Sequence, residues 1–264
     1  MKISIITVCY NEEKNIAKTI ESVLNQTSNS FEYIICDGNS KDRTVEIAEL
    51  YTEKFKSKGI EYRVYSEKDG GIYFGMNNGI DRASGDYVIF TNAGDKLYDE
   101  EVISKIIEKV GDNTPTVIYG NCLFVDRCVG VIYNADHTKL SEYMSIAHPA
   151  TLVRTDIIKQ NKFDTSFKIA ADYNMMLDLY NKNYEFFKLQ TVISQFQTDG
   201  ISSTNFEASI KEAGRAKLTH GYAYDEEKEI SAAAEGANRK RRKLPKFVRK
   251  FWNKNIKKRL WIED

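Results

Sequence analysis

The sequence predicts an α/β protein with a mostly parallel sheet flanked by helices. Two observations predict this class. Short runs rich in Ile, Val and Tyr alternate with segments of helical periodicity, and the apolar runs of the first half end in polar turns. Strands that alternate with helices need crossover connections, which place neighbouring strands parallel. The 264 residues, 42% hydrophobic and 29% charged, are enough for one large domain of this class.

Periodicity places the elements of the first half. Four short apolar runs are the expected strands, over residues 3–8, 33–36, 62–66 and 87–91. Apolar side chains at helical spacing fill the gaps. They form one helix face at 16–24, behind residues 11–13, and a second at 45–55, and further helices are predicted over 72–83 and 99–109. Asn11 is the expected N-cap of the first of these helices.

The second half shows fewer regular elements. Residues 116–133 alternate in the manner of a strand pair, and residues 186–196 form a further expected strand. A loop is expected at 200–204, before another helix. A helix should also begin at about Asp172, because the apolar residues that follow it have helical spacing: Tyr173, Met176, Leu177 and Tyr180.

Each of the first four strands is followed by a turn rich in polar residues. Parallel strands joined by right-handed crossovers end at the same edge of a sheet, so these turns should converge on one cleft. They span residues 7–12, 37–42, 67–71 and 92–95. Taken singly, each polar residue could be only a turn or cap residue. Four successive polar strand ends, however, predict a shared binding site.

Two carboxylates in these turns indicate the kind of ligand. Asp37, just past the second strand, could accept hydrogen bonds from a ribose or a base. Asp95 follows the small residues Asn92, Ala93 and Gly94. A carboxylate in such a turn suits a hard divalent cation that carries a diphosphate. The turns therefore indicate an enzyme that uses a nucleotide.

The hydrophobic runs and the cysteines indicate the compartment in which the protein is expected. No apolar run approaches the roughly 20 residues that span a bilayer, and the first residues are predicted to form a strand, not a signal peptide. Cys9, Cys36, Cys122 and Cys128 form no C-x-x-C pair. Reduced thiols packed as small hydrophobic groups, in the cytoplasm, are therefore expected.

The net charge of zero conceals an uneven distribution. From Arg239 onward there are 12 Lys and Arg residues and two acidic ones, a balance of +10, which leaves −10 for residues 1–238. Apolar and aromatic residues from Leu244 to Leu260 keep helical spacing, which predicts a basic amphipathic C-terminal helix. Such a helix suits the surface of an anionic membrane. Docking on the acidic body and a nucleic-acid patch are the alternatives; the membrane is favoured, and no nucleic acid is expected as a partner.

An ordered set of motifs resembles one enzyme family. The motifs are ITVCYNE at 6–12, CDGNSKDRT at 36–44, SEKDGGIY at 66–73, ASGDYVIFTNAGD at 83–95, HPAT at 148–151 and KIAADY at 168–173. Over roughly residues 1–205 the sequence resembles family 2 glycosyltransferases, and within them it is most similar to bacterial enzymes of the colanic-acid and O-antigen type. The order and spacing of these motifs make the resemblance far more specific than any single motif would.

The resemblance implies a GT-A fold, a nucleotide-sugar donor, Mn²⁺ or Mg²⁺ as cofactor, and inversion at the anomeric carbon. Asp95 would be the metal-binding carboxylate and Asp172 the general base. His148 would contact the acceptor or complete the metal's ligands, although a structural histidine is as consistent with its position. The residues that would hold the nucleotide sugar are Thr7, Cys9, Tyr10, Glu12, Asp37, Asp69, Asn77, Asn92, Ala93 and Asp95.

Two departures from the family pattern bear on the site. The metal motif usually has two acidic residues, whereas residues 92–95 contain only Asp95, so the diphosphate and water would supply most of the metal's oxygen ligands. Phe74 stands where relatives commonly carry Asp, which bears on donor or acceptor specificity. Asp172 also has a purely structural interpretation, because a carboxylate at that position could simply favour the start of its helix.

The predicted organisation is a glycosyltransferase domain over 1–222, with a donor-binding half (1–112) and an acceptor-binding half (113–222). An acidic, Ala-rich linker (223–238) and the basic tail (239–264) follow. The expected acceptor is a glycan or polyprenyl-linked oligosaccharide, at the inner face of the cytoplasmic membrane in cell-surface polysaccharide biosynthesis. An inactive nucleotide-binding scaffold is one alternative. A sugar-phosphate nucleotidyltransferase is another, although the first turn lacks the Gly-rich loop that such an enzyme needs.

Overall fold

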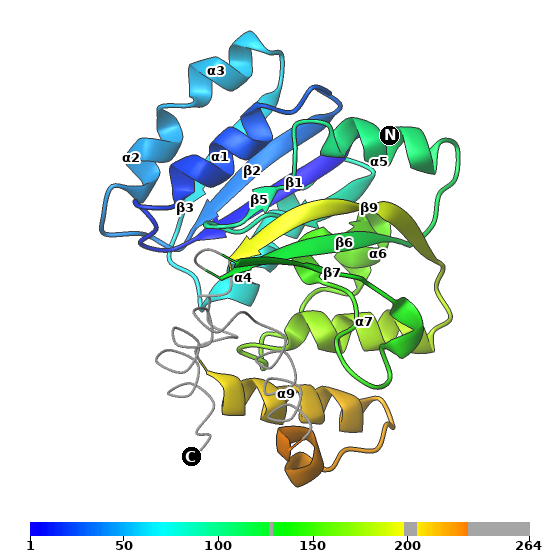
Figure 1. Cartoon of the computed structure of the whole chain (residues 1–264). Helices are drawn as coiled ribbons and strands as arrows, with labels where there is room; N and C mark the ends of the chain where they lie inside the picture. Colours follow the sequence, from blue (N-terminus) through cyan, green and yellow to red (C-terminus); the bar gives the residue numbers. More distant parts are fainter. Residues whose placement is uncertain (127–128, 198–204, 232–264) are drawn as a thin grey trace.

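The computed structural model describes residues 1–126, 129–197 and 205–231 (Figure 1). The strands are β1 (Ile3–Cys9), β2 (Phe31–Asp37), β3 (Glu61–Ser66), β4 (Tyr87–Phe90), β5 (Lys96–Leu97), β6 (Val117–Asp126), β7 (Val129–Tyr133), β8 (Thr151–Arg154) and β9 (Phe186–Gln197). The helices are α1 (Ile16–Leu24), α2 (Thr44–Glu49), α3 (Thr52–Ser57), α4 (Ile72–Arg82), α5 (Val102–Val110), α6 (Thr155–Gln160), α7 (Ala171–Asn181) and α9 (Phe206–Thr219). Two short 3₁₀ turns, η1 (His137–Lys139) and η2 (His148–Ala150), precede β8.

Within the described residues, nine strands form a single sheet in the order β3-β2-β1-β4-β8-β6-β9-β5, with β7 paired to β6. The first four strands are parallel, as predicted, and their registers align Cys9 with Asp37 and Asp37 with Ser66. The second half is mixed. There β8 runs antiparallel to both β4 and β6, while β6 and β9 are parallel. The expectation of a mostly parallel sheet thus holds for the first four strands and not for the remainder.

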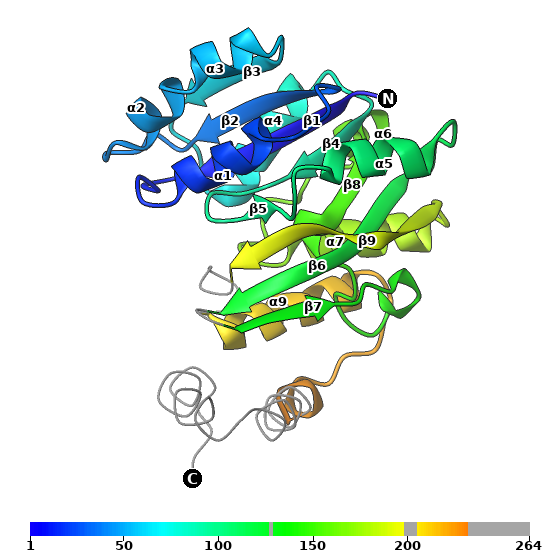
Figure 2. The same cartoon turned by 45° about the horizontal axis from the view of Figure 1, so that its top comes forward.

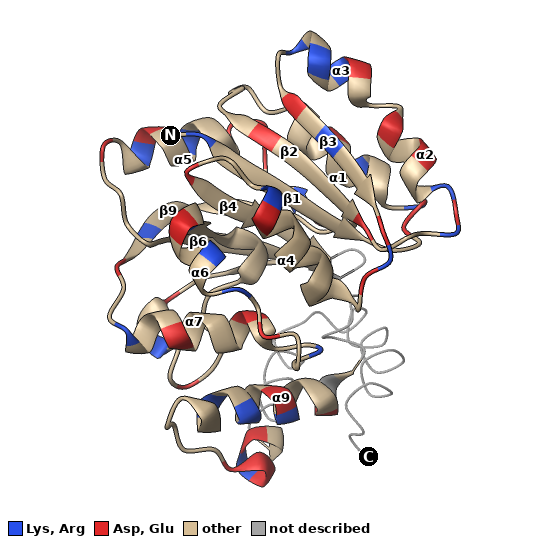
Figure 3. Cartoon of the chain, turned by 180° about the vertical axis from the view of Figure 1, so that it is seen from behind, with Lys and Arg blue, Asp and Glu red and all other residues tan. Residues whose placement is uncertain are grey.

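Helices cover both faces of the sheet because the central strands are apolar on both sides. On β1, Ile3 and Ile5 pack into the cluster that contains the buried residues of α1, α2, α3 and α5. Ile6 and Val8, which alternate with them, pack into the cluster of α4, α6 and α7. Figures 2 and 3 show these two groups on opposite faces, with α9 lying along α7 on the side away from the sheet.

Close approach of α4 to the sheet depends on two glycines one turn apart. A Cβ atom on Gly75 would lie 2.7 Å from a methyl group of Val8, and one on Gly79 would lie 2.5 Å from a methyl group of Ile6. Both distances are too short for real contacts, so larger side chains would push the helix away. The start of α4, which carries Tyr73, is thereby held against the tip of β1.

Several predicted boundaries differ from the structure. The first helix begins at Ile16, and Asn11 is not its N-cap: Asn11 has φ of 54°, and its side chain binds the neighbouring turn. The helix expected over 45–55 is broken into α2 and α3. Sequence reasoning also missed β5, β8 and α6. The strand pair over 116–133, the strand at 186–196 and the helix at Asp172 are confirmed.

Some expectations fall outside the described residues. These are the loop at 200–204, part of the linker, the basic tail at 239–264, and Cys128. Cys9, Cys36 and Cys122 are buried free thiols, as expected. Of the helices that the structure describes, none has both the length and the apolar character needed to cross a bilayer.

Candidate active site

The turns after β1 and β2 are joined by hydrogen bonds into one surface. The Asn11 backbone N–H donates to the Ser40 hydroxyl over 2.8 Å, and the Lys41 N–H donates to the Asn11 side-chain oxygen, also over 2.8 Å. The Glu12 N–H donates to the Thr44 hydroxyl over 2.7 Å. The predicted convergence of the first two strand tips is therefore confirmed.

Asp37 organises the centre of this surface. It ends β2 and is only 2% exposed. Its carboxylate accepts hydrogen bonds from the Ser40 N–H (2.9 Å), from the Ser40 hydroxyl and from the Ser66 hydroxyl (2.6 Å). The Cys9 thiol lies 3.7 Å away, and burial together with the Asp37 charge raises the pKa of that thiol, which stays protonated as a donor. The tips of β1, β2 and β3 thus meet at one carboxylate.

Asp69 extends the surface from the third tip. One of its oxygens accepts the Gly71 N–H over 2.9 Å. The other would lie 3.3 Å from a Cβ atom on Gly38, so the carboxylate rests directly against the turn that follows β2. Asp69 and Asp37 are therefore neighbours across this turn, as the sequence predicted.

Thr19 on α1 shapes the fourth tip, the turn from Asn92 to Asp95. Its hydroxyl accepts the Gly94 N–H over 3.0 Å and donates to the Asp95 carbonyl over 2.7 Å. Gly94 has φ of 100°, a conformation that favours glycine. Sequence reasoning missed Thr19; the available signal was a polar residue on the apolar face of α1, beside Ile16 and Ile20.

The oxygen atoms of this turn fit a hard divalent cation. Asp95 is 5% exposed, and one carboxylate oxygen accepts the Gln197 N–H over 3.2 Å. The side-chain oxygen of Asn92 is buried and has no hydrogen-bond partner among the described residues. In the described part of the chain, no group of three or more His, Cys, Asp or Glu side chains is arranged to hold a metal ion by itself. A cation here would be Mg²⁺ or Mn²⁺ and would need a diphosphate or water for its remaining ligands.

Asp172 lies in the first turn of α7 and faces α4. Its Oδ1 atom is 3.2 Å from the Tyr73 hydroxyl and accepts the Tyr173 N–H over 2.9 Å. Within the described residues, Oδ2 has no hydrogen-bond partner and is available to a ligand. Burial, followed by the Asp172 charge, raises the pKa of Tyr73, which therefore remains a protonated donor.

A row of aromatic rings connects Asp172 with the fourth tip. The ring centroid of Phe163 lies 5.4 Å from that of Tyr73 and 5.6 Å from that of His148. His148 in turn stacks on Phe90, the last residue of β4, at 5.2 Å. Burial lowers the pKa of His148, and the nearby Asp172 charge only partly opposes this effect. A neutral imidazole thus lies between the two carboxylate regions of the site.

Other predicted residues take different positions. The Thr7 side chain is fully buried: it donates to the Thr91 carbonyl over 2.6 Å and points away from the surface. Asn77 forms a reciprocal pair with the Phe163 backbone, at 2.9 and 3.0 Å, so both its amide groups hold the loop after α6. Both side chains thus make hydrogen bonds that fix the backbone around the site.

The remaining predicted residues lie near the strand tips. Tyr10 is 58% exposed just after β1. Glu12 accepts a hydrogen bond from the Asn15 side chain over 2.8 Å. Ala93 is half-buried and its N–H reaches the Val8 carbonyl at 3.4 Å. Phe74 is 40% exposed on the first turn of α4, with its ring against Gly70.

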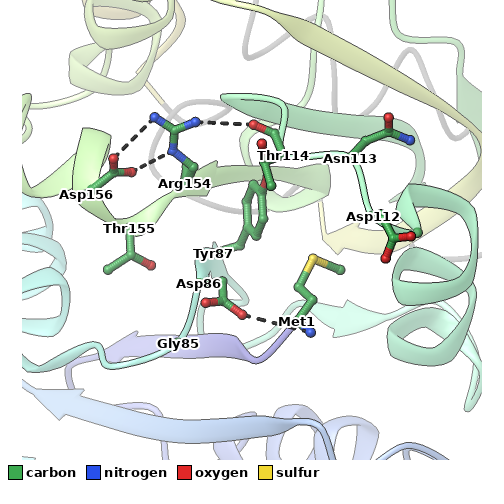
Figure 4. Close-up of a pocket in the computed structure, with 11 residues that line it drawn as sticks. Met1, Gly85, Asp86, Tyr87, Asp112, Asn113, Thr114, Arg154, Thr155 and Asp156 are labelled. Atoms are coloured by element: carbon green, nitrogen blue, oxygen red, sulfur yellow. Dashed lines mark hydrogen bonds and ion pairs between the residues drawn. The ribbon is translucent and has the colours of Figure 1, made fainter.

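An open depression of about 540 Å³ lies at the opposite edge of the sheet (Figure 4). Four of its charged groups form two pairs: Arg154 contacts Asp156 at 2.7 Å, and the amino terminus lies 4.0 Å from Asp86. Tyr87, which begins β4, also lines it. The depression is thus separated from the strand tips by the length of β4 and has no connection with the site described above.

Comparison with known proteins places the chain in a family. The family described as "Glycosyl transferase family 2" matches residues 4–181, about two thirds of the sequence. The chain belongs to glycosyltransferase family 2. All four polar strand tips and Asp172 of this family 2 member lie within the matched region.

Individual proteins agree with this assignment. A PGL/p-HBAD biosynthesis glycosyltransferase of Mycobacterium bovis is 25% identical over 182 residues, covering 67% of this chain and 69% of the relative. The structure of S. aureus TarS 1–349 with UDP-GlcNAc has a TM-score of 0.65 at 20% identity, over 89% of this chain and 71% of that one. The mannosyltransferase PcManGT from Pyrobaculum calidifontis, with GDP-Man and Mn²⁺, has a TM-score of 0.63 at 15% identity, over 89% and 64%. The expected GT-A fold is confirmed.

Proposed function

We propose that this protein transfers a sugar from a nucleotide-sugar donor to a hydroxyl group of a glycan or lipid-linked acceptor, with inversion at the anomeric carbon. One observation carries the proposal. A carboxylate with a free oxygen, on Asp172, lies at one end of an aromatic row whose other end is Phe90, at the fourth polar strand tip. The family assignment supports the reaction class. The geometry supports separate roles for the strand tips, which would bind the donor, and for Asp172, which would act on the acceptor.

The strand tips form the donor side. Asp37 and Asp69 would bind the nucleoside, in a surface whose backbone is held by hydrogen bonds within and between the turns. Asp95 and Asn92 would hold the metal through oxygen atoms. When bound, Mn²⁺ or Mg²⁺ would act as a Lewis acid toward the leaving diphosphate. UDP is the expected nucleotide, by resemblance to the family. GDP and dTDP stay open, and the two solved structures named above hold different donors, UDP-GlcNAc in one and GDP-Man in the other.

Asp172 would act as the base in an in-line displacement. The acceptor hydroxyl attacks the anomeric carbon and loses its proton to Oδ2 of Asp172, while the bond to the diphosphate breaks. Tyr73 holds the other carboxylate oxygen and does not compete for the proton, because burial keeps its own hydroxyl protonated. His148 and Phe163 would exclude water from the region between nucleophile and donor, which limits hydrolysis.

The setting is proposed to be cell-surface polysaccharide biosynthesis at the inner face of the cytoplasmic membrane. The acceptor would then be a polyprenyl-linked oligosaccharide, bound by the second half of the chain. The strongly basic composition from Arg239 onward supports this location, because it would be attracted to anionic lipid.

The test is release of nucleoside diphosphate from a panel of UDP-, GDP- and dTDP-sugars with Mn²⁺ or Mg²⁺ and acceptor. We expect release with one donor, and its loss in Asp172→Asn and in Asp95→Ala. Asp178→Asn is the matched control, because Asp178 lies on the same helix and, among the described residues, its side chain pairs with the half-exposed Lys182. Binding of a donor without turnover under any condition would contradict the proposal and favour an inactive nucleotide-binding scaffold.

A further inference from the structure

Glu212 on α9 binds the backbone that leads into α7. Its carboxylate accepts the N–H groups of Lys168 (2.8 and 2.9 Å), Ile169 (2.7 Å) and Ala170 (3.0 Å). Three successive N–H groups that point to one carboxylate form a concave anion-binding backbone. The anion in this case is supplied by the protein itself, from more than 40 residues further along the chain.

This contact lies at the N-terminal end of α7. The first N–H groups of a helix have no partner inside the helix, and Ala170, the N-cap residue, has no side chain that could satisfy them. Glu212 accepts the N–H of Ala170 and those of the two residues before it, and it places negative charge where the helix dipole favours it. Figure 3 shows α9 alongside α7, as this contact requires.

A second contact fixes the same segment. Arg215, on the next turn of α9, places its guanidinium 3.5 Å from the centre of the Phe167 ring and donates to the Ser166 hydroxyl over 2.8 Å. The segment 166–170 is therefore held by α9 at two points, one electrostatic and one aromatic. Its backbone is not free to move independently of α9.

The held segment is connected directly to Asp172. Ile169 donates its N–H to Glu212 and accepts the Tyr73 hydroxyl at its carbonyl over 2.6 Å. That same hydroxyl lies 3.2 Å from Oδ1 of Asp172. Without Glu212, three N–H groups would lack an acceptor immediately before Asp172, whose carboxylate is the nearest one on α7. A carboxylate turned back to them would no longer present Oδ2 to an acceptor hydroxyl.

We propose that Glu212 is a positioning residue for Asp172. By occupying the N–H groups before α7, it keeps the Asp172 carboxylate beside Tyr73 with one oxygen directed to the acceptor. This inference rests on the proposed function, since it takes Asp172 to be the base. It assigns a role in the reaction to α9, a helix that lies beyond the region matched by the family.

The kinetic test is a double-mutant cycle between Glu212→Gln and Asp172→Asn. We expect Glu212→Gln to lower kcat for transfer about tenfold while the donor KM changes by less than about twofold. On the residual activity of Asp172→Asn the same change should cost less than about twofold, because the carboxylate that Glu212 positions has already been removed. Glu207→Gln is the matched control on α9: Glu207 is exposed and pairs with Lys211 at 2.6 Å, so its loss should change neither constant.

The structural test needs no activity. A crystal structure of the full-length Glu212→Gln protein should show the Asp172 carboxylate displaced from the Tyr73 hydroxyl toward the backbone at 168–170. An unmoved carboxylate would overturn the inference. This holds even if the wild-type protein transferred no sugar, in which case the proposed function would fail separately.

In the kinetic test, equal losses of kcat in both backgrounds would also overturn the inference. So would a lower melting temperature with an unchanged kcat, and either result would leave Glu212 with a structural role alone. If Glu212→Gln does not fold, Glu212→Asp, which keeps the charge on a shorter side chain, should show the same pattern with a smaller loss.

Discussion

The hydroxyl group of Tyr73 on α4 lies 3.2 Å from Oδ1 of Asp172 on α7. The same hydroxyl makes a shorter bond, 2.6 Å, to the Ile169 carbonyl. Its single proton therefore serves mainly the carbonyl, and the Asp172 carboxylate is held in place without being fully hydrogen-bonded. A base needs this combination of a fixed position and an oxygen that still has capacity to accept a proton.

Tyr73→Phe tests this relationship. The change removes the hydroxyl and keeps the ring against Phe163. We expect kcat for transfer to fall about tenfold, which corresponds to about 1.4 kcal/mol of transition-state stabilisation. The free energy of unfolding should fall by about 1 kcal/mol for the lost bond to Ile169. Steady-state kinetics and urea denaturation measure the two effects, and Tyr65→Phe, on β3, is the control. A kcat equal to that of wild type would mean that Tyr73 does not assist Asp172.

Thr19→Val tests the turn that carries Asp95. Valine keeps the shape but leaves the Gly94 N–H and the Asp95 carbonyl without their partner. Each unsatisfied buried group costs about 1–3 kcal/mol, so the turn should relax and the affinity for a nucleoside diphosphate with Mn²⁺ should fall about tenfold or more. Calorimetric titration measures this affinity. Thr19→Ser keeps the hydroxyl and should bind nearly as wild type; equal affinities for the Val and Ser variants would refute the assignment.

Local patterns were sufficient to predict the parallel half of the fold and its carboxylates. Asp37 directly follows a buried strand, and Asp95 follows another by five residues, so periodicity alone put both at one edge of the sheet. The same reasoning could not find β8. That strand has four residues, too few to show a period, and its position is set by pairing with β4 and β6.

Residues that act over long sequence separations were not predictable. Thr19 binds Gly94 from 75 positions away, and Glu212 binds Lys168 from 44 positions away. Neither interaction produces a pattern in the sequence around the two residues that it joins. Asn77 shows the same limit: the resemblance implied a contact with the donor, and sequence reasoning did not find the hydrogen bonds of its amide with Phe163, 86 residues later. Hydrogen bonds between residues far apart in the sequence determine where the side chains of Thr19, Glu212 and Asn77 lie.

Glu32 should govern stability in acid. Its side chain is fully buried at the opposite end of the sheet from the strand tips. Burial raises its pKa, but hydrogen bonds from Ser4 and Ser84 outweigh this and hold the pKa below its ordinary value of 4.5. Because the folded-state pKa is the lower one, the stabilisation is fully present above about pH 4.5 and is lost as the pH falls through the folded-state value.

Glu32→Gln is therefore expected to lower the free energy of unfolding by about 2–3 kcal/mol at pH 7, with a difference from wild type that shrinks in acid. Urea denaturation at a series of pH values from 7 to about 3 measures this difference. Glu61→Gln is the control. Lys2 lies 3.7 Å from Glu32 and 3.3 Å from Glu61, but Glu61 is half-exposed, so its change should cost less than about 1 kcal/mol. A difference for Glu32→Gln that stays constant with pH would contradict the linkage.

Deletion of residues 239–264 tests the proposed membrane association. The deleted residues carry a balance of +10, and each basic residue near an anionic surface contributes about 1 kcal/mol. We expect the full chain to sediment with phosphatidylglycerol-containing vesicles and to be released by high salt, which screens the attraction. The shortened chain should stay in solution yet retain transfer to a soluble acceptor analogue, because the described site lies wholly before residue 239. Neutral vesicles provide the control. Equal sedimentation of both chains with anionic vesicles would assign the contact to the body of the protein.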